Sequence, residues 1–310
     1  MNLLRSALLK GSESRWLARN LPRFAFSRRA VKRFMPGESL AEALDECAVL
    51  ARNRTGSVIT RLGENIDSIA EADAAYNHYL DALSDIGRRG LPTHLSVKLT
   101  QLGLDISVDH AATCTSNIAQ ASSQIDAPVW IDMESSRYVD VTVDVYNRVR
   151  AQHENVGLCV QAYLHRTQKD VEQLLGKTTA LRLVKGAYKE PAEVAMQNKS
   201  DVDRNYLACA YTLLEAARSG SVGYVPAFAT HDVAIINEIN ARAREMGVAR
   251  DAYEFQMLYG IGRAQQQKLA SEGYRLRVLI SYGSAWFAWY MRRLAERPAN
   301  VWFVVKSLVS

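Results

Sequence analysis

The stretch Pro128-Val129-Trp130-Ile131-Asp132-Met133-Glu134-Ser135 shows the pattern that decides the fold, a short apolar run that ends in charged residues. A second run, His94-Leu95-Ser96-Val97, ends in Lys98 in the same way. Short apolar runs of this kind predict buried strands. A charged group at the end of such a run is costly to bury unless it is paired or used. For each charged residue taken alone, the alternative to a functional role is a structural salt bridge between neighbouring strands.

Runs of this kind alternate with helix-period segments, most clearly 69–86 and 108–123. One strand and its helix take up roughly thirty residues, the size of a βα unit. The predicted strands are 57–65, 94–102, 128–135, 156–164, 180–188, 223–231, 253–260 and 274–280. Eight such units predict an α/β protein with a (β/α)8 TIM-like barrel. The helical sequence before residue 55, with a break at Pro36-Gly37 and a new helix capped by Ser39, predicts an N-terminal helical extension.

In a barrel of this type the chemistry lies at the carboxyl ends of the strands. Polar residues gather at the predicted ends, namely Lys98, Asp132, Glu134, Gln161, Arg182, Lys185, Thr230, His231 and Gln256. The chain has no G-x-G-x-x-G motif after its first strand and no G-x-x-x-x-G-K-[ST] motif. A Rossmann or P-loop nucleotide site is therefore not expected.

The composition is that of a soluble globular enzyme, because 48% of the 310 residues are hydrophobic and 23% are charged. The four cysteines lie far apart without metal-ligand spacing, which predicts buried thiols in a reducing compartment and no metal site. They are Cys47, Cys114, Cys159 and Cys209. No apolar run reaches the ~20 residues that a membrane span needs.

The net charge of +5 comes mainly from the N-terminal arm, where basic residues far outnumber acidic ones. The basic residues of the arm are Arg5, Lys10, Arg15, Arg19, Arg23, Arg28, Arg29, Lys32 and Arg33. The pattern favours a solvated helical lead-in. Contact with an anionic membrane surface and a mitochondrial transit peptide are open alternatives. Nucleic-acid binding is the weakest hypothesis, because no interleaved aromatic and basic residues and no known motif accompany the charge.

A helix-period segment near the C-terminus carries Arg292, Arg293 and Glu296. Glu296 lies three and four positions after the two arginines, so it can brace one guanidinium while the other remains available. A guanidinium offers a planar pair of donors that matches a carboxylate, so the pair is suited to hold a small carboxylate. If only the spacing is considered, a solvated helix face is favoured over a carboxylate-binding site.

Five motifs together resemble the proline dehydrogenases from about residue 34 to residue 308, in the right order and with the right spacing. They are Trp130-Ile-Asp-Met-Glu-Ser135, Arg182-Leu-Val-Lys-Gly-Ala-Tyr188, Phe228-Ala-Thr-His231, Glu254-Phe-Gln-Met-Leu-Tyr-Gly260 and the Arg292-Arg293-x-x-Glu296 helix. Any one of them alone would be weak. The resemblance implies a distorted (β/α)8 barrel that binds FAD and oxidises L-proline to 1-pyrroline-5-carboxylate. It also implies that a hydride passes from ring C5 to flavin N5 and that the electrons pass to a quinone.

The resemblance also implies roles for individual residues. Asp132, Arg182 and Lys98 would be catalytic, with Arg182 near flavin N5. The substrate would contact Arg292, Arg293, Glu296, Lys98, Tyr188 and Leu279. The cofactor would contact Met133, Gln161, Arg182, Val184, Lys185, Gly186, Ala187, Thr230 and His231. The physical reading agrees, because Arg182 and Lys185 are cations suited to stabilise negative charge on a reduced flavin.

The sequence departs from the family pattern at Leu279, where the family usually has a tyrosine against the proline ring, and at Ser281, where it usually has a proline. The change alters the wall that faces the substrate ring, while the carboxylate-binding and flavin-binding motifs are kept. A different cyclic or ring-substituted amino acid is therefore the alternative substrate. A barrel that has lost activity and serves as a binding module is a further alternative. The intact Arg182, Asp132 and arginine pair count against it.

The predicted organisation is a helical arm over residues 1–55 that packs on the barrel and a catalytic, FAD-binding barrel over residues 56–310. The predicted partners are an amino-acid substrate and a quinone electron acceptor, with no nucleic acid and no metal. The resemblance implies a cytoplasmic protein. Peripheral contact with the inner membrane is left open.

Overall fold

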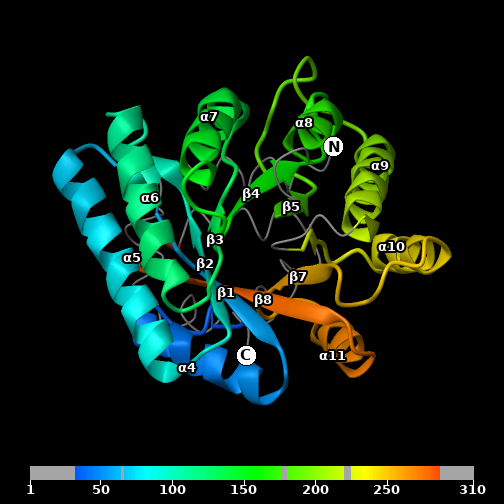
Figure 1. The fold of residues 1–310 in the computed structure, drawn as a ribbon, viewed down its shortest axis with the longest axis horizontal. Helices are drawn as coiled ribbons and strands as arrows, with labels where there is room; N and C mark the ends of the chain where they lie inside the picture. The colour runs from blue at the N-terminus through cyan, green and yellow to red at the C-terminus, as the bar shows by residue number, and fades with distance from the viewer. Residues whose placement is uncertain (1–31, 64–65, 176–179, 220–224, 287–310) are drawn as a thin grey trace, which may run out of the picture.

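Eight parallel strands close into a barrel in the computed structural model, which describes residues 32–63, 66–175, 180–219 and 225–286 (Figure 1). Each strand pairs with the next along the chain, and β8 pairs with β1. The strands are β1 (Gly56–Arg61), β2 (Thr93–Val97), β3 (Val129–Ile131), β4 (Val156–Gln161), β5 (Leu181–Val184), β6 (Ala227–Ala229), β7 (Glu254–Leu258) and β8 (Arg275–Tyr282). The predicted (β/α)8 barrel is confirmed.

Helices surround the barrel on the outside, as Figure 1 shows. They are α4 (Leu40–Arg52), α5 (Ile69–Arg89), α6 (Val108–Ser123), α7 (Val139–Arg150), α8 (Thr167–Leu175), α9 (Lys199–Arg218), α10 (Val233–Glu245) and α11 (Arg263–Ser271). Two short 3-10 helices, η2 (Leu99–Leu102) and η3 (Ser136–Tyr138), follow β2 and β3. The helix predicted over 108–123 has those exact bounds, and the helix predicted over 69–86 continues to Arg89.

The helix start predicted at Ser39 is confirmed by a capping box. The Ser39 hydroxyl accepts from the Glu42 backbone N–H, and the Glu42 carboxylate accepts from the Ser39 backbone N–H. This exchange satisfies two of the backbone donors that a helix start leaves open. The helix α4 packs against β1 and β8. Residues 1–31, which make up most of the predicted arm, lie outside the described residues, so the arm and its boundary at residue 55 stay predictions.

The two faces of the strands bury different kinds of side chain. The outward faces pack against the helices in one large apolar core, to which Leu95, Ile131, Leu181 and Phe228 belong. The register aligns Thr60, Ser96, Trp130 and Gly157 across four strands on the other face. Because side chains alternate along a strand, these residues point into the barrel. The interior is therefore partly polar, which marks it as a place for chemistry rather than for packing alone.

Several predicted strands are longer than the observed ones. The prediction over 94–102 is wrong beyond Val97, because the chain turns there into η2. The buried carboxylate of Glu134 stabilises that turn by accepting from the Thr100 backbone N–H at 3.1 Å and from the Thr100 hydroxyl at 2.7 Å. The strand predicted over 180–188 likewise ends at Val184. β8, in contrast, runs two residues further than predicted, to Tyr282.

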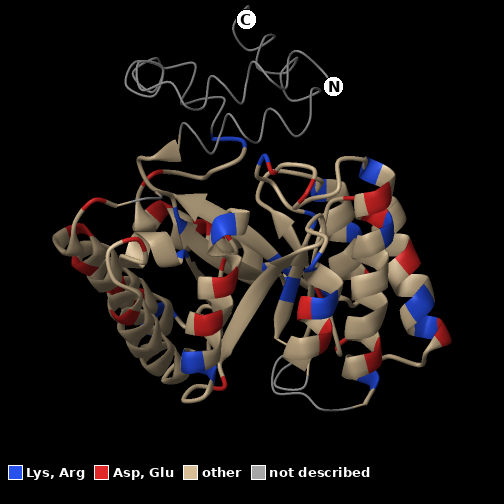
Figure 2. Ribbon diagram, turned by 90° about the horizontal axis from the view of Figure 1, so that it is seen from above, with Lys and Arg blue, Asp and Glu red and all other residues tan. Residues whose placement is uncertain are grey.

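The four cysteines are buried and free, as predicted. Within the described ranges no group of His, Cys, Asp and Glu side chains has the arrangement of a metal site. No helix in the described part of the chain has the length and hydropathy needed to span a membrane. Figure 2 shows both acidic and basic residues on the outer helices.

Candidate active site

The centre of the candidate site is a buried ion pair between Arg182 of β5 and Asp132, the residue directly after β3. Arg182 is 2% exposed, and its Nη1 lies 2.8 Å from Asp132 Oδ1 and 2.9 Å from Ser96 Oγ. Ser96 of β2 also donates to Asp132 Oδ1 at 2.8 Å. Three strands therefore bring one cation, one anion and one hydroxyl into contact. Because a buried charge without a partner is strongly unfavourable, Asp132 keeps Arg182 in the barrel.

The rest of the Arg182 guanidinium is left open. Its Nε and Nη2 atoms are buried and have no hydrogen-bond partner among the residues that the structure describes. Nε and Nη2 lie on the same edge of the planar group, opposite to the side that Nη1 uses. Arg182 therefore presents a two-donor edge that matches a ligand with two neighbouring acceptors. Buried donors of this kind are expected to have a partner when the site is filled.

Lys98 lies directly after β2 and is partly buried. Within the described ranges its ammonium group forms no hydrogen bond or ion pair. The Glu134 carboxylate that holds η2 fixes the backbone next to Lys98. The structure thus assigns Glu134 a supporting position and leaves Lys98 available to bind an anion.

The last residue of β5 and the segment after it supply four of the predicted cofactor residues, Val184, Lys185, Gly186 and Ala187. The ladder to β4 continues beyond the strand end, because Ala162 N donates to Val184 O and Tyr163 N donates to Lys185 O, both at 2.8 Å. Gly186 has φ +112, and a Cβ at this position would lie 2.1 Å from the Tyr163 ring. Only glycine allows the backbone to lie this close to Tyr163. Tyr188 follows in the same segment and is partly buried.

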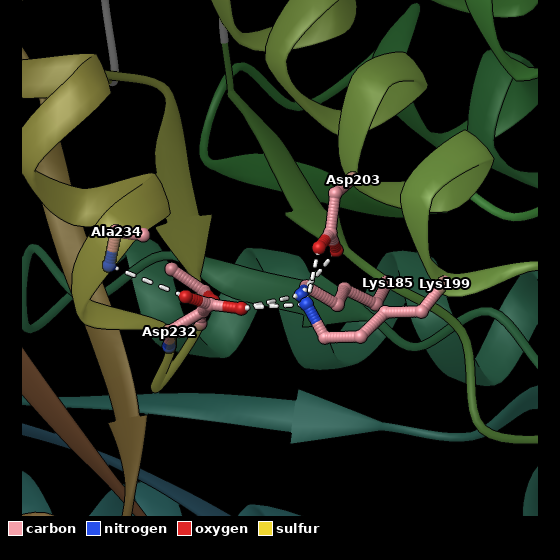
Figure 3. Close-up of polar contacts among 6 residues, drawn as sticks. Lys185, Lys199, Asp203, Asp232 and Ala234 are labelled. Atoms are coloured by element: carbon pink, nitrogen blue, oxygen red, sulfur yellow. Dashed lines mark hydrogen bonds and ion pairs between the residues drawn. The ribbon is translucent and has the colours of Figure 1, made fainter.

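Lys185 lies in a charged cluster that joins β5, α9 and the start of α10 (Figure 3). Its Nζ is 2.5 Å from Asp203 Oδ1 and 3.0 Å from Asp232 Oδ2, and Lys199 pairs with the same two carboxylates. Burial acts to raise the pKa of Asp232, but the hydrogen bonds and charges of Lys185 and Lys199 outweigh it and lower the pKa to about 2. The cluster therefore ties the residue directly after β5 to α9 and to the start of α10.

The other predicted cofactor residues lie at the carboxyl ends of β3, β4 and β6. Gln161 Nε2 donates to Met133 O at 3.3 Å, while its Oε1 is buried with no partner in the described part of the chain. Thr230 Oγ1 accepts from Asp232 N at 3.1 Å. His231 Nε2 accepts from Leu258 N at 3.1 Å, which joins the ends of β6 and β7. All four residues are held in place by backbone contacts.

The remaining predicted residues differ in where they lie. Leu279 lies in the barrel and packs against the small buried cluster of Val58, Trp130 and Ala227. Arg292, Arg293 and Glu296 lie outside the described residues, so their roles stay predictions. The placement of Arg182 and Gln256 at the carboxyl ends of strands was wrong, because Arg182 is the second residue of β5 and Gln256 is the middle residue of β7. The Gln256 amide donates to Glu254, the first residue of β7, toward the amino end of the barrel.

No role was assigned from the sequence to Ser96 or Trp130, which both contact Arg182. The Arg182 Cζ lies 4.6 Å from the centroid of the Trp130 ring. Each residue stands two positions before the charged residue that directly follows its strand. Ser96 precedes Lys98 in this way, and Trp130 precedes Asp132. That spacing places each of them on the same face as the charge, a signal that could have identified them.

Known proteins are similar to this chain over most of its length. A family model described as proline dehydrogenase matches residues 43–306, which is most of the chain. The chain belongs to the proline dehydrogenase family. Proline dehydrogenase 1 of Bacillus subtilis subsp. natto is 36% identical over 307 residues, which cover 99% of each chain. The proline dehydrogenase of Deinococcus radiodurans is 35% identical and covers 90% of this chain and 89% of its own length.

Solved structures share this barrel fold. The crystal structure of proline utilization A from Bdellovibrio bacteriovorus, inactivated by N-propargylglycine, superposes with a TM-score of 0.80 at 25% identity. The match covers 94% of this chain and 36% of that one. The resemblance inferred from the five motifs is thereby confirmed at the level of family and fold.

Proposed function

We propose that this proline dehydrogenase family member oxidises L-proline to 1-pyrroline-5-carboxylate, with FAD as hydride acceptor and a quinone as the final electron acceptor. The observation that carries the proposal is the open edge of Arg182. Its buried Nε and Nη2 donors lack partners among the described residues, whereas Nη1 is held by Asp132 and Ser96. An oxidation that places negative charge on a bound acceptor is favoured by a fixed cation of this kind.

The residues around Arg182 fit a flavin. Besides the donors of Arg182, the site holds the buried Oε1 of Gln161, which has no partner within the described ranges. A planar ligand with both acceptors and donors would satisfy both sets of atoms. FAD, when bound, would supply the hydride acceptor. The residues proposed to hold it are Met133, Gln161, Arg182, Val184, Lys185, Gly186, Ala187, Thr230 and His231.

Binding of the substrate is proposed to depend on cations. Lys98 is partly buried and forms no ion pair within the described ranges, so it is available for a carboxylate. Arg292 and Arg293 are proposed to complete the carboxylate site, with Glu296 bracing one of them. These groups would orient the amino acid, while the apolar interior around Leu279 excludes water from its ring.

The test is proline oxidation by purified, FAD-loaded protein with a quinone or a dye as acceptor. The wild type should be yellow and should reduce the acceptor only when proline is present. Arg182→Ala should slow flavin reduction by about a hundredfold, because a preorganised charge at the reacting centre is lost. Arg218→Ala, which removes an exposed arginine of α9 paired with Glu215, is the control and should behave as wild type. Wild-type flavin reduction in Arg182→Ala would contradict the proposal.

The packing of Leu279 favours a second candidate, the oxidation of a bulkier or ring-substituted cyclic amino acid. An apolar leucine against Val58, Trp130 and Ala227 offers no hydroxyl to a substrate ring. A panel of proline, 4-hydroxyproline and pipecolate would rank the substrates. We expect Leu279→Tyr to raise kcat/KM for proline and lower it for larger rings, by an amount typical of one methylene, about tenfold. An unchanged ranking would remove Leu279 from the determinants of specificity.

A cytoplasmic location with peripheral contact at the inner membrane is part of the proposal, because a quinone acceptor resides in lipid. The basic N-terminal arm, outside the described residues, is the segment proposed to make that contact. Cosedimentation with anionic vesicles, compared with neutral ones, would test it. Equal binding to both, or none, would contradict it.

A further inference from the structure

Beneath the Arg182 guanidinium lies the indole ring of Trp130, in the middle of β3. Trp130 is 1% exposed, and the Arg182 Cζ lies 4.6 Å from its ring centroid. The indole N–H donates to His94 Nδ1 at 3.2 Å, across the neighbouring strand β2. A polar bond therefore anchors one edge of the ring while its face supports a cation.

The barrel is built to admit this ring. Gly157 is aligned with Trp130 on the next strand, β4. A Cβ at Gly157 would lie 2.6 Å from the Trp130 ring atoms Cε3 and Cζ3. Any larger residue at position 157 would push the indole away from its present place. Gly157 and the hydrogen bond that Trp130 donates to His94 thus constrain the same ring from two sides.

The polar contacts of Arg182 hold only one end of its guanidinium. Asp132 and Ser96 both bind the single atom Nη1, and no hydrogen bond holds the Nε and Nη2 edge within the described structure. The contact between the guanidinium face and Trp130 therefore adds a support that these hydrogen bonds do not give. A cation over an aromatic face is attracted to it, and the contact is stronger when both groups are buried.

His94 can hold the ring only as a neutral imidazole, because its Nδ1 must accept the hydrogen bond from the indole N–H. Burial, together with the positive charges of Arg277, Arg182 and Arg275, lowers the pKa of His94 well below its usual value. Arg277 is itself paired with Glu254 at 3.0 Å. His94 therefore stays an acceptor at neutral pH.

We propose that Trp130, oriented by His94 and given room by Gly157, is a positioning residue that sets the plane of the Arg182 guanidinium and so aims its two open donors at the bound cofactor. This inference rests on the proposed function. It goes beyond it by assigning the control of the Arg182 guanidinium plane to the aromatic ring beneath it. The competing explanation is that Trp130 only fills space between Val58, Ala227 and Leu279.

The experiment compares Trp130→Leu, Trp130→Met and Trp130→Phe with Phe228→Leu as the matched control. Phe228 is a fully buried aromatic residue of the neighbouring core, in contact with Tyr253 and Phe255. The readouts are the urea unfolding midpoint, the affinity of apoprotein for FAD, the midpoint potential of the bound flavin, and kcat and KM for proline. Met is the second variant because its flexible side chain refills the space without a ring.

Trp130→Leu and Trp130→Met should make the flavin potential more negative and lower kcat about tenfold, with KM for proline nearly unchanged. Trp130→Phe keeps a face but lacks the N–H and should fall between them and wild type. Phe228→Leu should lower the unfolding midpoint and leave the potential unchanged. In an Arg182→Ala background, Trp130→Leu should shift the potential no further.

Wild-type potential and kcat in folded Trp130→Leu or Trp130→Met would overturn the inference, as would an equal further shift in the Arg182→Ala background. A wild-type protein that binds no FAD or leaves proline unoxidised would instead contradict the proposed function.

Discussion

At the scale of single residues, the site depends on one side chain, Arg182, with only part of its hydrogen-bond donors paired. Arg182 uses Nη1 for Asp132 and Ser96 and keeps Nε and Nη2 open within the described structure. Removing either partner would leave a buried charge or hydroxyl without its contact, at a cost of several kcal/mol for the charge. Glycine residues matter where the backbone must come close to a ring. Gly186 against Tyr163 is the clearest case beside the site.

Gly186→Ala should therefore be strongly destabilising. The φ of +112 disfavours any Cβ, and this Cβ would collide with the Tyr163 ring at 2.1 Å. Together the two effects should lower the free energy of unfolding by about 2–5 kcal/mol, measured by urea denaturation. Gly247→Ala is the matched control, with φ +70 and no atom within 4 Å of the added Cβ, and should cost about 1 kcal/mol. If both variants lower the free energy of unfolding equally, the contact with Tyr163 adds nothing to the cost of a side chain at position 186.

At the scale of elements, charged pairs join the barrel to its outer helices near the site. Lys185 after β5 and Lys199 at the start of α9 share the carboxylates of Asp203 and Asp232. Asp232 also caps α10 by accepting from Ala234 N at 3.2 Å. One carboxylate thus connects β5, α9 and α10, as Figure 3 shows.

The Asp232 carboxylate should make stability depend on acid pH. Its pKa in the folded protein is about 2, below the ordinary value of 3.8, so the unfolded chain binds the proton more readily. The contribution is complete above about pH 4 and is lost as the pH falls through 2. Asp232→Asn keeps a capping oxygen but removes the charge, so its stability should fall less between pH 4 and pH 2 than that of wild type. Urea midpoints over this range test it.

Asp144→Asn, on the helix α7, is the control for the acid titration, because Asp144 forms no hydrogen bond or ion pair within the described ranges. It should follow wild type at every pH. If Asp232→Asn also follows wild type, the cluster adds nothing to stability that depends on the charge of Asp232.

At the scale of the whole molecule, the barrel separates packing from chemistry. Its outer face and helices form the large apolar core, while its interior holds the polar contacts of Arg182 with Asp132 and Ser96. The strand ends bring together residues that are far apart in the chain, such as Ser96 and Arg182, 86 positions apart. The substrate contacts proposed for Arg292 and Arg293 lie outside the described residues.

Arg292→Met and Arg293→Met should each raise KM for proline about tenfold or more while FAD stays bound. Each guanidinium is proposed to form charge-assisted bonds with the substrate carboxylate, worth about 1.5–3 kcal/mol when desolvated. Steady-state kinetics and the flavin absorbance of the purified variants measure both effects. Arg88→Met, which removes an exposed arginine paired with Asp85, is the control. Unchanged KM in both variants would place these arginines outside the substrate site.

From its sequence alone, the chain could be recognised as an eight-unit barrel with functional residues at strand ends, because strand and helix periods and strand-end charges are local features. Lys98, Asp132 and Lys185 were predicted in this way, and each directly follows its strand. The contacts around Arg182 could not be predicted, since Ser96, Trp130 and Asp132 reach it only through the register of closed strands. The period of a strand says which face a residue occupies, but the packing of the whole barrel decides which residues meet there.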